Sequence, residues 1–153
     1  MIEQLMRLLQ GRDAPAAPTE DDLRMAVAAL LVEAARMDAS FDSAERSAVS
    51  TILAKRFGLS GSDVASLVSR ADTRIQDTAQ YFPFTHSINT RMSAEQKAEV
   101  IEMLWQVAYV DGELDPEEDR LIRQIAGLIH VTDRERMLAR RRVLDGTGGE
   151  TEH

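Results

Sequence analysis

An internal repeat constrains the fold of this chain more than any other feature of its sequence. The segment LLVEAARMDASFDSAERSAVSTIL, residues 30–53, aligns with MLWQVAYVDGELDPEEDRLIRQIA, residues 103–126, at an offset of 73 positions. Each copy joins two apolar helical runs through a turn with the motif D-x-x-Φ-D-x-x-E, in which Φ is apolar. Because each helix–turn–helix unit leaves an apolar face that the other can cover, we expect the copies to pack about a pseudo-two-fold axis, with their acidic turns near one another.

The spacing of apolar residues predicts an all-α fold, a compact bundle of about seven helices. Apolar side chains recur at intervals of three and four residues, and no segment alternates long enough to form a strand. The segment 94–110 is apolar on more than one face, so we expect it to be the central helix, with Trp105 buried. The predicted helices span residues 19–37, 43–57, 60–81, 84–91, 94–110, 116–130 and 132–144.

The chain divides into three parts. Residues 1–18 combine a short amphipathic helix, Met1–Gln10, with a linker rich in Pro and Ala. Residues 19–144 form the helical domain, and residues 145–153 (DGTGGETEH) are expected to be a flexible tail. The first ten residues have no convincing basic n-region, so no signal peptide is predicted.

Composition excludes several classes of function. A net charge of −8 and a pI near 4.9 leave no general footprint for nucleic acid. The chain has no Cys, which excludes a disulfide, a thiolate metal site and a cysteine nucleophile. No apolar run approaches the roughly 20 residues of a membrane-spanning helix. These features predict a cytoplasmic protein.

Catalytic motifs are likewise missing from the sequence. No nucleophile elbow or phosphate-binding loop is present. The three histidines, His86, His130 and His153, are scattered, and His130 is expected to be a partly buried capping residue at a helix end. We therefore predict a protein that is not an enzyme.

The acidic residues of the repeat form the candidate site, and one interpretation of them is purely local. Asp42 and Asp115 occupy N-cap positions, and Glu45 and Glu118 stand three residues later, where they can complete capping boxes. The remaining two acids can close turns onto nearby backbone N–H groups. The six candidate residues are Asp38, Asp42, Glu45, Asp111, Asp115 and Glu118.

The other interpretation is a site for Ca²⁺ or Mg²⁺, both of which prefer oxygen ligands. Asp38 and Asp111 stand at helix C-termini, where a carboxylate is disfavoured unless a cation or hydrogen bond compensates. The turn is not an EF-hand, because Pro116 and Ile122 stand where that loop, counted from Asp111, needs Gly and Glu. Local capping and cation binding both remain open.

A longer segment carries a family resemblance. FTHSINTRMSAEQKAEVIEM followed by LWQVAYVDGELDPEEDRLIRQIAGLIHV resembles the tellurite resistance protein B (TerB)-like family, and the resemblance extends over roughly Leu23 to Leu144. The first copy departs from the family's D-G pattern at Ala39. The resemblance implies a bacterial, cytosolic bundle of about seven helices, linked to metal and stress responses through acidic residues suggested to bind cations.

The resemblance leads to two functional hypotheses. The first is a non-enzymatic module that binds a divalent cation or a protein partner, with a membrane complex among the candidate partners. The alternative is a purely structural protein–protein interaction domain whose acids serve only as helix caps. A homo-oligomer formed through the N-terminal helix is compatible with either.

A basic cluster, RERMLARRR at residues 134–142, runs against the net charge of the chain. Cations near a helix C-terminus are favourable, so we favour a well-terminated, solvated helix. A basic patch for an acidic partner or for lipid headgroups is the functional alternative.

Deletion of residues 1–18 tests whether the N-terminal helix docks. A helix this short is unstable alone, so its apolar stripe predicts docking on a neighbouring chain, a membrane surface or its own domain. We expect the deletion to change the oligomeric state, the binding to lipid vesicles or the melting temperature. If all three match those of the full chain, the segment has no docking role.

Overall fold

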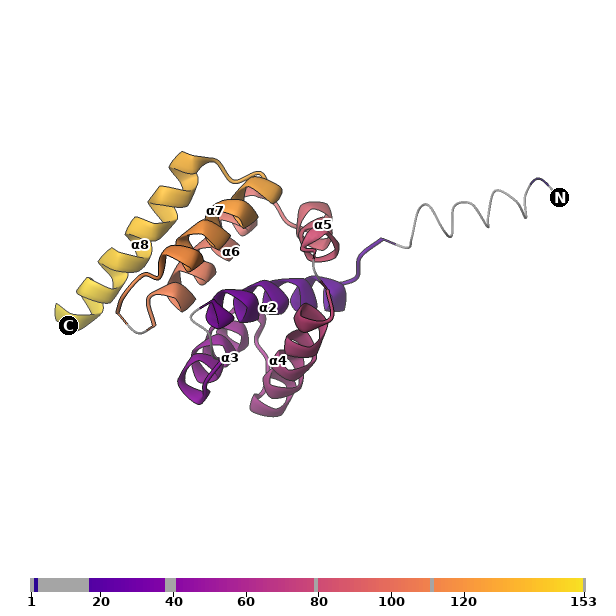
Figure 1. The fold of residues 1–153 in the computed structure, drawn as a ribbon, viewed down its shortest axis with the longest axis horizontal. Coiled ribbons are helices and arrows are strands. Elements are labelled where there is room, and N and C mark those ends of the chain that lie inside the picture. The colour runs from indigo at the N-terminus through magenta and orange to yellow at the C-terminus, as the bar shows by residue number, and fades with distance from the viewer. Residues whose placement is uncertain (1, 3–16, 38–40, 79, 111, 153) are drawn as a thin grey trace.

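A computed structural model describes residues 2, 17–37, 41–78, 80–110 and 112–152, with side chains as far as residue 146. Over these residues the chain forms seven helices and no strand (Figure 1), which confirms the all-α prediction. The helices are α2 (Glu20–Arg36), α3 (Ser43–Phe57), α4 (Gly61–Gln76), α5 (Phe82–Arg91), α6 (Ala94–Ala108), α7 (Pro116–Leu128) and α8 (Asp133–Glu152).

Local sequence signals set most helix boundaries. Thr19 and Ser93 cap α2 and α6 through complete capping boxes. Ser60 caps α4, and its hydroxyl accepts the backbone N–H of Asp63 at 3.2 Å. Gly58 ends α3 with a φ of 64°, a left-handed conformation in which a side chain is strained.

Three predicted boundaries are wrong. The third helix, expected to reach residue 81, ends at Gln76, and α5 begins at Phe82 instead of after Pro83. Proline fits the first turn of a helix, where its missing N–H costs nothing, so Pro83 lies in the first turn of α5 and does not interrupt it. At the C-terminal end, α8 continues past the predicted limit of Leu144 to Glu152.

The connection before α5 is tied to α2 by a short hydrogen bond. The hydroxyl of Tyr81 donates to the carboxylate of Glu33 at 2.6 Å. Burial, and then the hydrogen bond and the negative charge of Glu33, raise the pKa of Tyr81 well above its usual range. The tyrosine therefore stays protonated and holds the end of the connection against α2.

The most central helix is α2, which corrects the prediction for residues 94–110. Its sequence from Leu23 to Ala35 is almost continuously apolar and almost entirely buried. It contacts α3, α4, α5, α6 and α7, whereas α6 contacts α2, α3, α7 and α8. In Figure 1, α3 and α4 lie on one side of α2, and α6, α7 and α8 lie on the other. The many alanines of α2 let these neighbours approach closely.

The predicted pairing of the two repeat copies is visible in the helix contacts. The first copy is α2 and α3, the second is α6 and α7, and α2 packs against α6. The smaller contacts between the copies match as well: α2 of the first copy contacts α7 of the second, and α6 of the second contacts α3 of the first. A third helix extends each copy: α4 packs on α2 as α8 packs on α6. The structural repeat therefore has three helices per copy, joined by α5.

Trp105 lies in the centre of the second copy, as predicted. Its side chain is fully buried, and its indole N–H donates to the backbone oxygen of Arg136 in α8 at 3.1 Å. The guanidinium group of Arg140 lies 5.7 Å from the indole ring. The tryptophan thus fixes α8 on α6 by packing and by a hydrogen bond.

Replacement of Trp105 should separate these two contributions. Trp105→Ala should lower the free energy of unfolding by about 3–5 kcal/mol, because it leaves a large cavity. Trp105→Phe should cost about 1–3 kcal/mol, because the oxygen of Arg136 loses a buried donor. Phe82→Ala, at a ring that is 67% exposed, should change stability by less than about 0.5 kcal/mol.

Chemical denaturation of the three variants makes this comparison, and tryptophan fluorescence provides an independent check. An emission maximum typical of a solvated indole would contradict the account. So would a similar loss of stability for Trp105→Ala and Phe82→Ala.

Candidate cation site at the two acidic turns

The aspartates that begin α3 and α7 act as helix caps, as predicted. A carboxylate oxygen of Asp42 accepts the backbone N–H of Glu45 at 2.9 Å. A carboxylate oxygen of Asp115 accepts the backbone N–H of Glu117 at 2.8 Å, and Pro116 occupies the first turn behind it. Local helix chemistry therefore accounts for both aspartates.

The prediction that Glu45 and Glu118 complete capping boxes is wrong. The reciprocal bond from the third residue back to the cap is present in α2, in α6 and between Thr132 and Glu135 at the start of α8. At α3 and α7 the cap consists of the aspartate's bond. The caps of α3 and α7 therefore rest on Asp42 and Asp115.

These two glutamates instead line one cavity between the copies of the repeat. Asp42 and Glu45 come from the first copy and Glu118 from the second, and the cavity volume is about 210 Å³. The rest of the wall includes the apolar end of α6, at Val107 and Ala108. The expectation that the two acidic turns lie near one another therefore holds for these three acids.

Burial makes Glu118 the most unusual of the three. Its residue is only 5% exposed, whereas Glu45 is half-buried and Asp42 is exposed. Removing a carboxylate from water is costly unless hydrogen bonds or opposite charges compensate. Carboxylates that share one hollow also repel each other, and a cation in the hollow would reverse the sign of that interaction.

Two of the candidate ligands, Asp38 and Asp111, lie outside the described residues. Within the described part of the chain, no group of three or more His, Asp or Glu side chains meets the geometry expected of a metal site. The described acids therefore supply part of a ligand set and not a complete one. His86 and His130 lie on α5 and after α7, away from this group in the chain.

His130 differs from its prediction. It is exposed instead of partly buried, and its φ of 65° places it in the left-handed region. It ends α7 through its backbone: the next N–H, of Val131, donates to the oxygen of Ala126 at 2.8 Å. Its role is therefore to end a helix.

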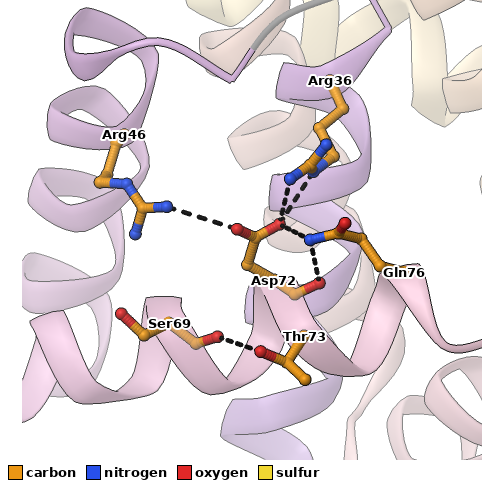
Figure 2. A network of polar contacts seen from close by, with 6 residues as sticks. All are labelled: Arg36, Arg46, Ser69, Asp72, Thr73 and Gln76. Carbon is orange, nitrogen blue, oxygen red and sulfur yellow. Dashed lines mark hydrogen bonds and ion pairs between the residues drawn. The ribbon is translucent and has the colours of Figure 1, made fainter.

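The first turn is flanked by a network that local sequence patterns do not reveal. Figure 2 shows the carboxylate of Asp72, on α4, between Arg36 at the end of α2 and Arg46 on α3. The Nε of Arg36 donates to it at 2.8 Å and the Nη2 of Arg46 at 3.3 Å. The Nε2 of Gln76 donates to the same carboxylate at 3.0 Å. One acid thus joins three helices beside the first turn.

The same arginines also hold the apolar residue of that turn. The guanidinium groups of Arg46 and Arg36 lie 4.7 Å and 5.8 Å from the ring centroid of Phe41. The sequence did not predict this network, because Arg46 and Arg36 lie 26 and 36 residues from Asp72 along the chain. Phe41 and the two flanking arginines were the available signal, but nothing local pointed to Asp72.

The two turns therefore differ in charge. At the repeat offset of 73, the positions of Arg36 and Arg46 hold Tyr109 and Asp119 in the second copy. The second copy therefore carries no cation of its own at these two positions, although Arg140 of α8 donates to the hydroxyl of Tyr109 at 2.7 Å. It also contains Gly112 with a φ of 85°, a conformation that favours glycine; Ala39 stands at the matching position of the first copy.

The fold and the candidate site define this chain as an all-α protein made of two helical repeats with an acidic turn in each. The family model described as Tellurite resistance protein TerB matches residues 24–141, so this chain belongs to the TerB family. Comparison with curated proteins and with solved structures gives no significant match. Among the described helices, none is both long and apolar enough to cross a membrane.

Substitution of Asp72 tests the network beside the first turn. Asp72→Asn should lower the free energy of unfolding by about 1–3 kcal/mol, because two guanidinium groups lose a carboxylate that is only 15% exposed. Asp145→Asn makes the same chemical change at a pair with Arg141 in which Asp145 is 76% exposed, and should cost less than about 0.5 kcal/mol. Equal effects in denaturant titrations would show that the network adds no more than a surface ion pair.

Proposed function

We propose that this chain is a non-enzymatic TerB module that binds one divalent cation, Ca²⁺ or Mg²⁺, between its two acidic turns. The observation that carries the proposal is the single cavity lined by Asp42 and Glu45 of one copy and by the buried Glu118 of the other. An internal repeat that only capped its own helices would have no need to direct acids from both copies into one hollow.

The ligand chemistry fits a hard cation. Ca²⁺ takes six to eight oxygen ligands in flexible geometry, and Mg²⁺ takes six, several of them water. The sequence offers Asp38 and Asp111 in the same two turns as the three acids of the cavity. The C-terminus of α6 adds the partial negative charge of its last carbonyl groups. Side chains from two separate turns suit the flexible geometry of Ca²⁺ better than the strict octahedron of Mg²⁺.

Family membership supports a proposal for the cellular role. We propose that the module acts in the bacterial cytoplasm, in a metal or tellurite stress response, and that the bound cation sets the charge seen by a protein partner. The capping bonds of Asp42 and Asp115 favour the alternative, an interaction domain without a ligand, because they explain those residues locally.

Thermal melting in chelator and in millimolar Ca²⁺ or Mg²⁺ separates the two functions. A ligand present at about 100 times its Kd stabilises the native state by about 2.7 kcal/mol, which raises the melting temperature by roughly 5–10 °C for a domain of this size. Glu118→Gln and Asp111→Asn should abolish most of this shift. In chelator, Asp111→Asn should leave the melting temperature unchanged or raised, because a carboxylate at a helix C-terminus is disfavoured.

Two cap variants serve as controls. Asp115→Ala should lower stability by about 1 kcal/mol with and without metal, as expected for a lost N-cap. Ser60→Ala removes a cap on α4, outside the acidic turns, and should show the same loss with the full metal shift retained. If the parent protein shows no metal-dependent shift, and Glu118→Gln and Asp111→Asn are destabilising in chelator, the acids are turn residues and the cation function is wrong.

A further inference from the structure

The outer face of α8 exposes large apolar side chains beside arginines. The exposed apolar residues are Met137, Leu138 and Leu144, at 44%, 44% and 42% exposure, respectively. They line a surface hollow of about 430 Å³. Figure 1 shows α8 at the outer edge of the bundle, next to α6 and α7. The other residues that line the hollow are Arg134, Arg140, Arg141 and Asp145.

The equivalent helix of the first copy provides an internal comparison. The buried positions of the two helices match at an offset of 72, which pairs Val64 with Arg136, Leu67 with Ala139, and Ala71 with Val143. In this register, the exposed positions of α4 that correspond to Arg134, Met137, Leu138 and Arg141 are Ser62, Ala65, Ser66 and Ser69.

At these four matched positions α4 carries only Ser and Ala, whereas α8 carries two arginines, a methionine and a leucine. Both sets of positions are exposed, so the fold does not require large side chains there. The large side chains of α8 therefore point to a contact outside the domain.

The charges on this face specify its partner. Arg134 and Arg141 are seven residues apart, so they stand two turns apart on one side of the helix, separated by about 10.5 Å. Arg141 is 79% exposed, and its pair with Asp145, at 3.9 Å, is too solvated to hold it strongly. Arg140, in contrast, is committed to the domain, since its Nε donates to the hydroxyl of Tyr109 at 2.7 Å.

We propose that this face binds an acidic amphipathic helix of a partner protein. The apolar stripe of that helix would cover Met137, Leu138 and Leu144, and two carboxylates about two turns apart would pair with Arg134 and Arg141. A hollow suits a projecting side chain of a partner helix better than it suits a flat bilayer. The chain's own residues 1–10 contain a single acid, Glu3, and so cannot supply both carboxylates.

The test uses the full chain and two designed, fluorescently labelled peptide helices. Both peptides carry the same leucine stripe, flanked in one by two glutamates seven residues apart and in the other by two lysines. Fluorescence anisotropy should show that the glutamate peptide binds and the lysine peptide binds at least tenfold more weakly. Higher salt should reduce the difference in affinity between the two peptides, because it screens the charges.

Variants on α8 assign the binding to this face. The double variant Arg134→Glu, Arg141→Glu should bind the glutamate peptide at least about tenfold more weakly than the parent does, and should bind the lysine peptide more tightly. Leu138→Gln should weaken both peptides by about tenfold. The control double variant Arg120→Glu, Arg123→Glu changes the net charge equally on α7, where both arginines are exposed and paired with acids, and should bind like the parent.

Several outcomes would overturn the proposal. One is failure of the glutamate peptide to bind at millimolar concentration, and another is equal binding of the two peptides. A loss of binding in the α7 control equal to that in the α8 variant would show a general charge effect. Binding of the α8 face to vesicles of phosphatidylcholine and phosphatidylglycerol but not to peptide would assign the face to membranes. Self-association that Leu138→Gln abolishes, without peptide binding, would assign it to a second copy.

Discussion

The burial of α2 against α6 holds the two halves of this protein together. Residues 27–32 of α2 are completely inaccessible to solvent, and α6 contains Ile101, Leu104 and Trp105, which are equally buried. Burial of this much apolar surface is the main favourable term in folding. It also fixes the ends of both helices, and each acidic turn begins where one of these helices ends. The position of the candidate site is therefore a consequence of the core.

The same packing explains why one repeat produces two different turns. Both copies place an aspartate cap and a glutamate three residues later, so both direct acids towards the junction between the copies. In the first copy, Arg36 and Arg46 stand beside the turn and share the carboxylate of Asp72. The second copy holds Tyr109 and Asp119 at those positions. The two turns therefore differ in sequence at the positions beside the shared cavity, and we expect a cation to depend most on the side of the buried Glu118.

Local chemistry determined what could be predicted from the sequence. The periodicity of apolar residues and the caps at Asp42 and Asp115 predicted the helices, because these signals act within one turn. The central helix was misassigned because Trp105 and its large neighbours outweighed the alanines of α2, although alanine permits the closest packing. The cavity shared by Glu45 and Glu118, and the network around Asp72, join residues from different helices. The repeat predicted that the two acidic turns lie near one another, but no spacing rule indicated which acids share the cavity or that Asp72 joins three helices.

The central claim is that the two turns make one site, and the stoichiometry of cation binding measures this directly. Isothermal titration of the full chain with Ca²⁺ should give one ion per chain. Substitution in either copy, at Glu45 or at Glu118, should abolish the same binding event, because both side chains line one cavity. Two ions per chain, each lost with only one of the substitutions, would show that the turns act independently. No detectable heat of binding for Ca²⁺ or Mg²⁺, together with an unchanged melting temperature, would contradict the account.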